Sequence, residues 1–176
     1  MTLNFDGKKH LVLDMDETLI CMVENRDEFF PKPYARPNLR EFLKIAFDEF
    51  ETVSIFTAAS EIWYNHVYEN VLKDYIPQGN SFHKVFKRND CIRDENGNYH
   101  KPLHRMHDDP TEVLLIDDNP TIFEMNPVGS CFLAERFEYD KLDSDKELYI
   151  LGVMMEIRNR SSCSDLKWNE VSFEWN

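Results

Sequence analysis

A short apolar run that ends in two acidic residues limits the possible fold more than any other part of the sequence. Leu11, Val12 and Leu13 are followed by Asp14 and Asp16, which are one residue apart. An uninterrupted apolar run of this length is typical of a strand in a parallel sheet that is covered on both faces. Open α/β sheets place their sites at the carboxyl ends of such strands. We therefore expect these carboxylates at a functional edge of a sheet.

The same two carboxylates predict a bound cation. Neither Asp14 nor Asp16 is followed by a basic partner, and two acids this close repel each other unless a cation or a shared proton compensates them. A divalent metal site is the interpretation that we favour. A calcium-binding loop also begins D-x-D, but it needs glycine at its sixth position and glutamate at its twelfth, where this chain has Leu19 and Asn25.

The rest of the chain alternates strand-like and helix-like patterns, which predicts a doubly wound α/β fold with a parallel sheet. The predicted strands cover 52–56, 83–87, 113–116 and 128–133, and the predicted helices begin near Pro37, at the cap Ser60 and at 144–158. The pair Asn96-Gly97 predicts a tight hairpin turn.

The segment 20–35 has no sustained periodicity and carries two prolines, so we expect a short flap over the end of the first strand. Its aromatic residues Phe29, Phe30 and Tyr34 either line a substrate groove or cover the edge of the core. The sequence leaves both interpretations open.

Composition indicates one globular domain over residues 1–176, with 42% hydrophobic residues, and we expect the tail at 159–176 to pack on its core. No apolar run is long enough to span a membrane, and no secretion signal is visible, so we expect a soluble intracellular protein, in the nucleus or cytoplasm of a eukaryote. The four cysteines are widely spaced, and we expect reduced thiols. The sequence does not indicate an oligomeric state.

The net charge of −13 disfavours nucleic acid and anionic membranes as partners. One basic cluster interrupts this acidic character, and it is either a phosphate-facing wall or a partner site. It comprises Lys84, Lys87, Arg88 and Arg93.

The segment L-V-L-D-M-D-E-T-L resembles motif I, D-x-D-x-[TV], of the haloacid dehalogenase (HAD) superfamily. Its form is similar to the Fcp/Scp phosphatases, the NLI-interacting-factor-like group that dephosphorylates the carboxy-terminal domain (CTD) of RNA polymerase II. Three later segments resemble the remaining motifs in order: Thr57-Ala58-Ala59-Ser60, Lys101 in Y-x-K-x-L, and Asp117-Asp118-Asn119-Pro120. Pro102 stands where the family usually has an acid.

The resemblance implies a HAD-like Rossmannoid sheet with a minimal cap, and it implies roles for individual residues. Asp14 would be the nucleophile that forms an aspartyl phosphate, and Asp16 the general acid and base. Mg²⁺ would be held by Asp14, the backbone carbonyl of Asp16 and Asp117. The remaining site residues are the phosphate-binding Thr57, Lys101 and amide of Ala58, and the supporting Thr18, which would brace the Asp16 loop, and Asp118, which would steady metal waters or pair with Lys101.

Two other chemistries fit the sequence less well. The spacing of His100, His104 and His107 is only loosely that of a zinc site, and no cysteine pair accompanies it. Cys21 lies just after the acidic pair, but a cysteine-phosphatase loop needs a C-x5-R run, and Asp27 occupies the position of the arginine.

Three functional hypotheses follow. The first is a Mg²⁺-dependent phosphatase that acts on phosphoserine or phosphothreonine in a protein or peptide. The segment before Arg36-Pro37 is shorter than in the small CTD phosphatases, so the sequence does not establish specificity for the polymerase tail. The second keeps the chemistry but uses a small metabolite, a nucleotide or a 3′-phosphorylated nucleic-acid end. The third is a binding protein with an inactive phosphatase fold, which the intact motif residues disfavour.

Overall fold

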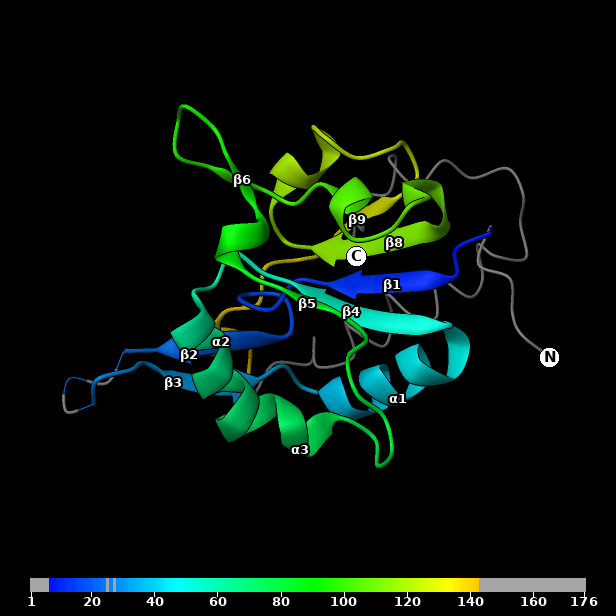
Figure 1. The fold of residues 1–176 in the computed structure, drawn as a ribbon. Helices are drawn as coiled ribbons and strands as arrows, with labels where there is room; N and C mark the ends of the chain where they lie inside the picture. The colour runs from blue at the N-terminus through cyan, green and yellow to red at the C-terminus, as the bar shows by residue number, and fades with distance from the viewer. Residues whose placement is uncertain (1–6, 25, 27, 143–176) are drawn as a thin grey trace, which may run out of the picture.

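The computed structural model describes residues 7–24, 26 and 28–142, and a five-stranded parallel sheet lies at its centre (Figure 1). The strand order is β5-β4-β1-β8-β9. The strands are β1 (His10–Leu13), β4 (Thr52–Phe56), β5 (Val85–Phe86), β8 (Val113–Asp117) and β9 (Cys131–Leu133).

The connectivity is doubly wound, as the sequence predicts. Strand β1 pairs with β4 on one side and with β8 on the other, so that Leu13 lies opposite both Ile55 and Ile116. From β1 the chain adds β4 and β5 in one direction and then crosses back to add β8 and β9 in the other. The order therefore reverses next to β1, and such a switch point is where open α/β sheets bind their ligands.

Alternate residues of β1 face two hydrophobic clusters. Leu11 and Leu13 pack with the apolar face of α1 (Leu39–Glu49) and with α2 (Glu61–Val67). Helix α2 continues through a π-helical turn, Tyr68–Leu72, into α3 (Lys73–Tyr75). Val12 faces the opposite cluster, which includes the short 3₁₀ turns Leu103–Arg105 and Pro120–Phe123. Because β1 is covered on both faces, its three buried side chains after His10 are all apolar.

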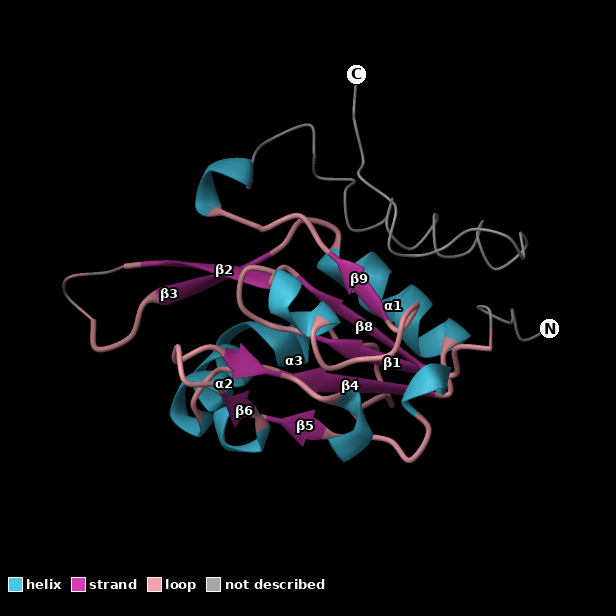
Figure 2. Ribbon diagram, turned by 90° about the horizontal axis from the view of Figure 1, so that it is seen from above, coloured by secondary structure: helices cyan, strands magenta, loops and turns pink. Residues whose placement is uncertain are grey.

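Two antiparallel hairpins lie outside the main sheet: β2 (Ile20–Val23) with β3 (Lys32–Ala35), and β6 (Ile92–Arg93) with β7 (Tyr99–His100). The β6–β7 hairpin has its turn at the predicted Asn-Gly pair, where Gly97 has a φ of 90°. The β2–β3 hairpin extends beyond the carboxyl edge of the sheet (Figures 1 and 2).

The β2–β3 hairpin lies in the segment 20–35, where the sequence predicts a flap, and it gives this segment two strands that the sequence pattern did not indicate. Pro33 lies within β3, opposite Met22. Proline has no N–H to donate to a strand ladder, and it is tolerated on the edge of a sheet. A strand with a proline at its second residue and only four residues in length gives little periodic signal, which explains why the sequence pattern missed it.

The other predicted elements are found near their expected bounds. The predicted strands at 83–87 and 128–133 are shorter in the structure, where they shrink to β5 and β9. Ser60 caps α2 by accepting a hydrogen bond from the backbone N–H of Trp63. Cys21, Cys91 and Cys131 are free thiols. The helix predicted at 144–158 and the tail at 159–176 lie outside the described residues.

Within the part of the chain that the structure describes, no helix combines the length and the apolar character that crossing a membrane requires.

Candidate active site

The loop after β1 turns tightly and presents Asp14 at the carboxyl edge of the sheet. The backbone N–H of Asp14 continues the strand ladder by donating to the carbonyl of Ile116, at 2.9 Å. Glu17 then adopts a left-handed conformation, with a φ of 61°, and Leu19 donates back to the carbonyl of Met15. The side chain of Asp14 is buried, with 4% of the residue exposed. The turn therefore holds a carboxylate in a fixed, largely dry position.

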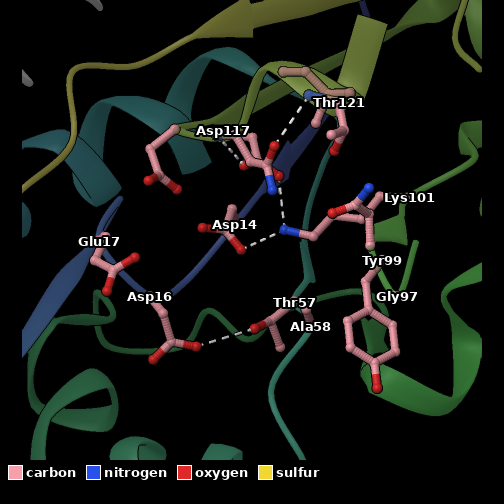
Figure 3. A pocket seen from close by; sticks show the side chains of 14 residues that line it. Asp14, Asp16, Glu17, Thr57, Ala58, Gly97, Tyr99, Lys101, Asp117 and Thr121 are labelled. Atoms are coloured by element: carbon pink, nitrogen blue, oxygen red, sulfur yellow. Dashed lines mark hydrogen bonds and ion pairs between the residues drawn. The ribbon is translucent and has the colours of Figure 1, made fainter. Parts of the chain in front are cut away.

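Lys101 joins the two acidic strand ends. Its Nζ donates to Oδ1 of Asp14 at 2.5 Å and to Oδ2 of Asp117 at 2.6 Å (Figure 3). Asp117 is the last residue of β8, and Lys101 follows β7. Lys101 therefore contacts one residue that is 87 positions away in the sequence, Asp14, and one that is 16 positions away, Asp117. The structure thus brings together the strand ends that the sequence predicts at one rim.

Asp16 points in a different direction from Asp14. Its Oδ1 accepts a hydrogen bond from the indole N–H of Trp63 at 2.6 Å, and its Oδ2 accepts one from the hydroxyl of Thr57 at 3.4 Å. Figure 3 shows the Asp16 carboxylate on the Thr57 side of the pocket, with Asp14 directed toward Lys101 instead. The two neighbouring acids therefore have separate partners, which suits separate chemical roles.

Thr18 contacts Asp14 rather than Asp16, which differs from the expectation that it braces the Asp16 loop. Its buried hydroxyl donates to Oδ2 of Asp14 at 2.9 Å. The guanidinium of Arg36 donates to the carbonyl of Thr18 at 3.0 Å and so fixes the backbone of the same turn. Thr18 and Lys101 together bind both oxygens of Asp14, so that its rotamer is fixed from two sides.

The carboxylates and Lys101 line a pocket of about 310 Å³. Its acidic residues are Asp14, Asp16, Glu17, Asp117 and Asp118, and its single basic residue among the described lining is Lys101. The other lining residues are Thr57, Ala58, Gly97, Asn98, Tyr99, Asn119, Thr121 and Ile122. Five acids and one lysine would repel a phosphate ester, so the pocket requires an additional cation to bind one.

The donor set fits Mg²⁺. One carboxylate oxygen from each of Asp14, Asp117 and Asp118 lies within 4.8 Å of the other two. Carboxylate oxygens without nitrogen or sulfur ligands are the donors that Mg²⁺ prefers. The side chain of Asp16 is not in this group, so its backbone carbonyl, which the resemblance implies as a ligand, is the candidate that Asp16 offers. Asp118 joins the group instead.

Burial and charge shift the pKa values of the acidic residues. Burial raises the pKa of Asp14 above its ordinary value; the Lys101 ammonium opposes this shift and Asp117 adds to it. Burial also raises the pKa of Asp16, against the hydrogen bond from Trp63. For Asp118, burial and the charges of Asp117 and Glu17 raise the pKa to about 6. These directions are those expected of acids crowded in a pocket that lacks enough positive charge.

Asp118 does not pair with Lys101, which was one of its two expected roles. Its carboxylate lies 3.7 Å from the guanidinium of Arg136, which also contacts Glu17 at 2.7 Å. The ammonium group of Lys101 donates to Asp14 and Asp117 instead. Because the Asp118 carboxylate lies close to both of these acids, a role at the metal is the expectation that the geometry favours.

Several residues of the site carry little signal in the sequence. The spacing of Trp63, Val67 and Val71 predicts one apolar face of a helix, yet the ring nitrogen of Trp63 binds Asp16. Gly97, Asn98 and Tyr99 enter the pocket from the β6–β7 hairpin. The sequence marks Gly97 as a turn residue and Tyr99 as part of Y-x-K-x-L, but it predicts no role in the site for any of the three.

The basic cluster, in contrast, lies outside the pocket lining. Lys84 donates to a backbone carbonyl, Lys87 pairs with Glu61, Arg88 donates to the carbonyl of Ala58, and Arg93 lies over the ring of Tyr99. Among the histidines, His107 stacks on His10 with ring centroids 4.1 Å apart, and His100 contacts Asp94.

The chain is similar to known phosphatases in sequence. Residues 9–167 match the family model described as NLI interacting factor-like phosphatase. A probable C-terminal domain small phosphatase from Dictyostelium discoideum is 30% identical over 164 residues, which cover 85% of this chain and 50% of that protein. The chain therefore spans about half the length of this relative.

Solved structures show the same fold. The fission yeast RNA polymerase II CTD phosphatase Fcp1, solved with bound beryllium fluoride, matches with a TM-score of 0.55 at 18% identity, over 91% of this chain and 52% of that one. A HAD superfamily (subfamily III A) hydrolase from Legionella pneumophila matches with a TM-score of 0.50 at 14% identity, over 93% and 94% of the two chains. The fold is thus the α/β fold of these two structures. Because the family model covers most of the sequence, the chain belongs to the NLI interacting factor-like phosphatase family.

Proposed function

We propose that this protein is a Mg²⁺-dependent phosphomonoester hydrolase that works through an aspartyl phosphate on Asp14 and acts on phosphoserine or phosphothreonine in proteins. The observation that carries the proposal is the arrangement around Asp14. A buried carboxylate contacts Lys101 and lies beside Asp117, while a second acid, Asp16, is held apart from it by Thr57 and Trp63.

Asp14 acts as the nucleophile. A carboxylate oxygen of Asp14 attacks the phosphorus atom, the bond between phosphorus and the ester oxygen breaks, and an aspartyl phosphate forms. The hydrogen bonds from Lys101 and Thr18 fix the carboxylate before the substrate arrives, so little reorientation is needed during the attack. Attack of water on the same phosphorus atom then releases inorganic phosphate and restores the Asp14 carboxylate.

Asp16 moves the proton in both steps. In the first step it donates a proton to the departing ester oxygen, and in the second it accepts a proton from the attacking water. This role needs an acid that is not tied to the nucleophile, and the carboxylate of Asp16 meets the requirement because its partners are Thr57 and Trp63.

The phosphoryl oxygens are bound by three groups from two parts of the chain. Lys101 supplies a positive charge, Thr57 supplies its hydroxyl, and Ala58 supplies its backbone N–H at the end of β4. Mg²⁺, bound by Asp14, Asp117 and the carbonyl of Asp16 with support from Asp118, would neutralise charge on the phosphoryl group. Asn119 donates its backbone N–H to Oδ1 of Asp117 at 2.8 Å and so orients that carboxylate.

A protein substrate is supported by the relatives and by the shape of the rim. The Dictyostelium relative is named as a C-terminal domain small phosphatase, and Fcp1 as an RNA polymerase II CTD phosphatase. In this chain, Tyr99 lines the pocket from one hairpin. On the other hairpin, Phe29 is 93% exposed and packs edge-to-face on Phe30, whose ring lies 6.1 Å from that of Trp63. An exposed aromatic side chain on this segment suits contact with residues that flank a phosphoserine.

The proposal is tested by measuring phosphate release from a panel of substrates, with and without Mg²⁺. The panel comprises phosphoserine and phosphothreonine peptides, p-nitrophenyl phosphate, nucleotides, sugar phosphates and oligonucleotides with a 3′-phosphate. We expect the highest kcat/KM with the phosphopeptides, and loss of activity when EDTA removes the metal.

Two substitutions accompany the panel. Asp14→Asn keeps the shape of the side chain but removes the nucleophile, and we expect it to abolish turnover. Asp48→Asn, on the exposed face of α1, is the matched control and should keep full activity. Turnover by a folded Asp14→Asn variant would overturn the assignment of the nucleophile. Preference for a nucleotide or a sugar phosphate would leave the chemistry in place but refute the protein substrate.

A further inference from the structure

We infer that Trp63 is a positioning residue, whose indole N–H orients the carboxylate of Asp16 for proton transfer. The inference rests on the proposed function, because it assigns a role to a residue that acts through the proposed general acid. Trp63 does not belong to the lining of the pocket among the described residues, whereas Asp16 does. Trp63 therefore reaches the pocket through Asp16, the lining residue to which it donates a hydrogen bond.

The contact between the two residues is short and directional. The Nε1 atom of Trp63 lies 2.6 Å from Oδ1 of Asp16, a distance at the strong end of hydrogen bonds to carboxylates. The indole nitrogen can only donate a hydrogen bond, so Oδ1 of Asp16 must be the acceptor. The other oxygen, Oδ2, lies 3.4 Å from the hydroxyl of Thr57 and is the one that faces the proposed phosphate-binding group. Trp63 thus determines which oxygen of Asp16 is presented to the substrate.

The indole ring is held in place independently of Asp16. The backbone N–H of Trp63 donates to the hydroxyl of Ser60, which fixes the first turn of α2. The ring of His66 is stacked with the indole, with centroids 5.5 Å apart and an interplanar angle of 21°. Phe30, from the segment between β2 and β3, lies 6.1 Å from the indole and 4.7 Å from the ring of His66. Because the indole is already fixed by its own neighbours, Asp16 loses little further conformational entropy when the substrate binds.

Trp63 is neutral at all accessible pH values, so it places no charge of its own beside Asp16. Its contribution is the hydrogen bond, which fixes one oxygen of the carboxylate. Orientation of Asp16 by Trp63 should matter most for the step in which Asp16 donates a proton to a poor leaving group, such as the alcohol of a serine. Substrates whose leaving group departs readily without a proton depend less on Asp16.

The test compares two substrates in the variant Trp63→Phe, which keeps an aromatic ring and removes the N–H. The measured quantity is kcat/KM, which reports formation of the aspartyl phosphate and not its later hydrolysis. For a phosphoserine peptide we expect a loss of about tenfold to a hundredfold, the range for losing one hydrogen bond to a charged group. For p-nitrophenyl phosphate, whose leaving group needs little protonation, we expect the loss to be smaller by about tenfold.

A double-mutant cycle distinguishes positioning from simple packing. In the Asp16→Asn background, Trp63→Phe should change kcat/KM by less than about twofold, because the group through which Trp63 acts is already gone. Equal losses for the two substrates, or a loss that persists in full in the Asp16→Asn background, would overturn the inference. Asn65→Ala, at an exposed position of the same helix, is the control and should leave both substrates unaffected.

A second variant covers the case in which Trp63→Phe does not fold. Incorporation of a benzothiophene analogue of tryptophan at position 63 replaces the N–H by sulfur and keeps the shape of the two rings. The same selective loss supports the inference, and full activity of this variant refutes it. The proposed function fails separately, since it would be refuted by a wild-type protein that hydrolyses neither substrate in the presence of Mg²⁺.

Discussion

Replacing Lys101 by methionine is expected to destabilise the protein far more than removing a surface lysine. The Nζ of Lys101 donates to Asp14 and Asp117, and the side chains of the three residues are 6%, 6% and 1% exposed. Methionine fills a similar volume but leaves two buried carboxylates without their shared cation. Removing one partner of a buried ion pair typically costs about 3–5 kcal/mol. For a chain of this length, that corresponds to a fall in Tm of about 6–20 °C.

The assay is urea and thermal unfolding of Lys101→Met in EDTA and in Mg²⁺, followed by circular dichroism. Lys87→Met is the matched control: its Nζ lies 2.8 Å from Glu61, but the two side chains are 24% and 69% exposed. Such a surface pair contributes about 0–1 kcal/mol. Added Mg²⁺ should recover part of the stability of Lys101→Met, because a cation that binds only the folded protein stabilises it. If Lys101→Met loses no more stability than Lys87→Met, the reasoning about the buried acids is wrong.

Two further predictions concern the scaffold. Burial, together with nearby His10 and Lys84, lowers the pKa of His107 to about 4, below the value of about 6.5 for an unfolded histidine. Between these two pH values the unfolded chain binds more protons than the folded protein. The free energy of unfolding should therefore fall as the pH drops from about 6.5 toward 4. His107→Gln should flatten that part of a urea-unfolding profile, and an unchanged slope would contradict the assignment. Ser60→Ala removes the cap of α2 and should lower the free energy of unfolding by about 1 kcal/mol in the same assay; a loss no larger than that of the exposed Ser81→Ala would show that the cap contributes nothing.

The sheet was predictable because its strands are buried on both faces. The runs that form β1 and β8 are mainly apolar, and the run that forms β4 is rich in β-branched and aromatic residues. Each run is short and leads into polar residues, a combination typical of central strands in a parallel sheet. Their carboxyl ends then had to meet at one edge. The contacts of Lys101 with Asp14 and Asp117 follow from that topology, although no sequence pattern gives the direction of a lysine side chain.

The site contacts that the sequence did not reveal are made by polar side-chain atoms, which a pattern of hydrophobic spacing does not record. Trp63 occupies a position on the apolar face of α2, so hydrophobic spacing treats it as a core residue, and its N–H is invisible to such a pattern. The contact of Thr18 with Asp14 depends on side-chain rotamers within a tight turn, which the sequence does not specify. The four-residue strand β3 was hidden by Pro33, whose effect on pairing depends on whether its strand has a free edge.

The most direct test of the account is to locate the phosphorylated residue. The Asp16→Asn variant should accumulate the intermediate with p-nitrophenyl phosphate and Mg²⁺, because this substrate needs little protonation to react while hydrolysis of the aspartyl phosphate requires a base. Reduction with borohydride followed by peptide mass spectrometry then identifies the modified side chain. We predict modification at Asp14, dependent on both Mg²⁺ and substrate. Modification at another residue, or none at Asp14 during continued turnover, would contradict the proposed mechanism.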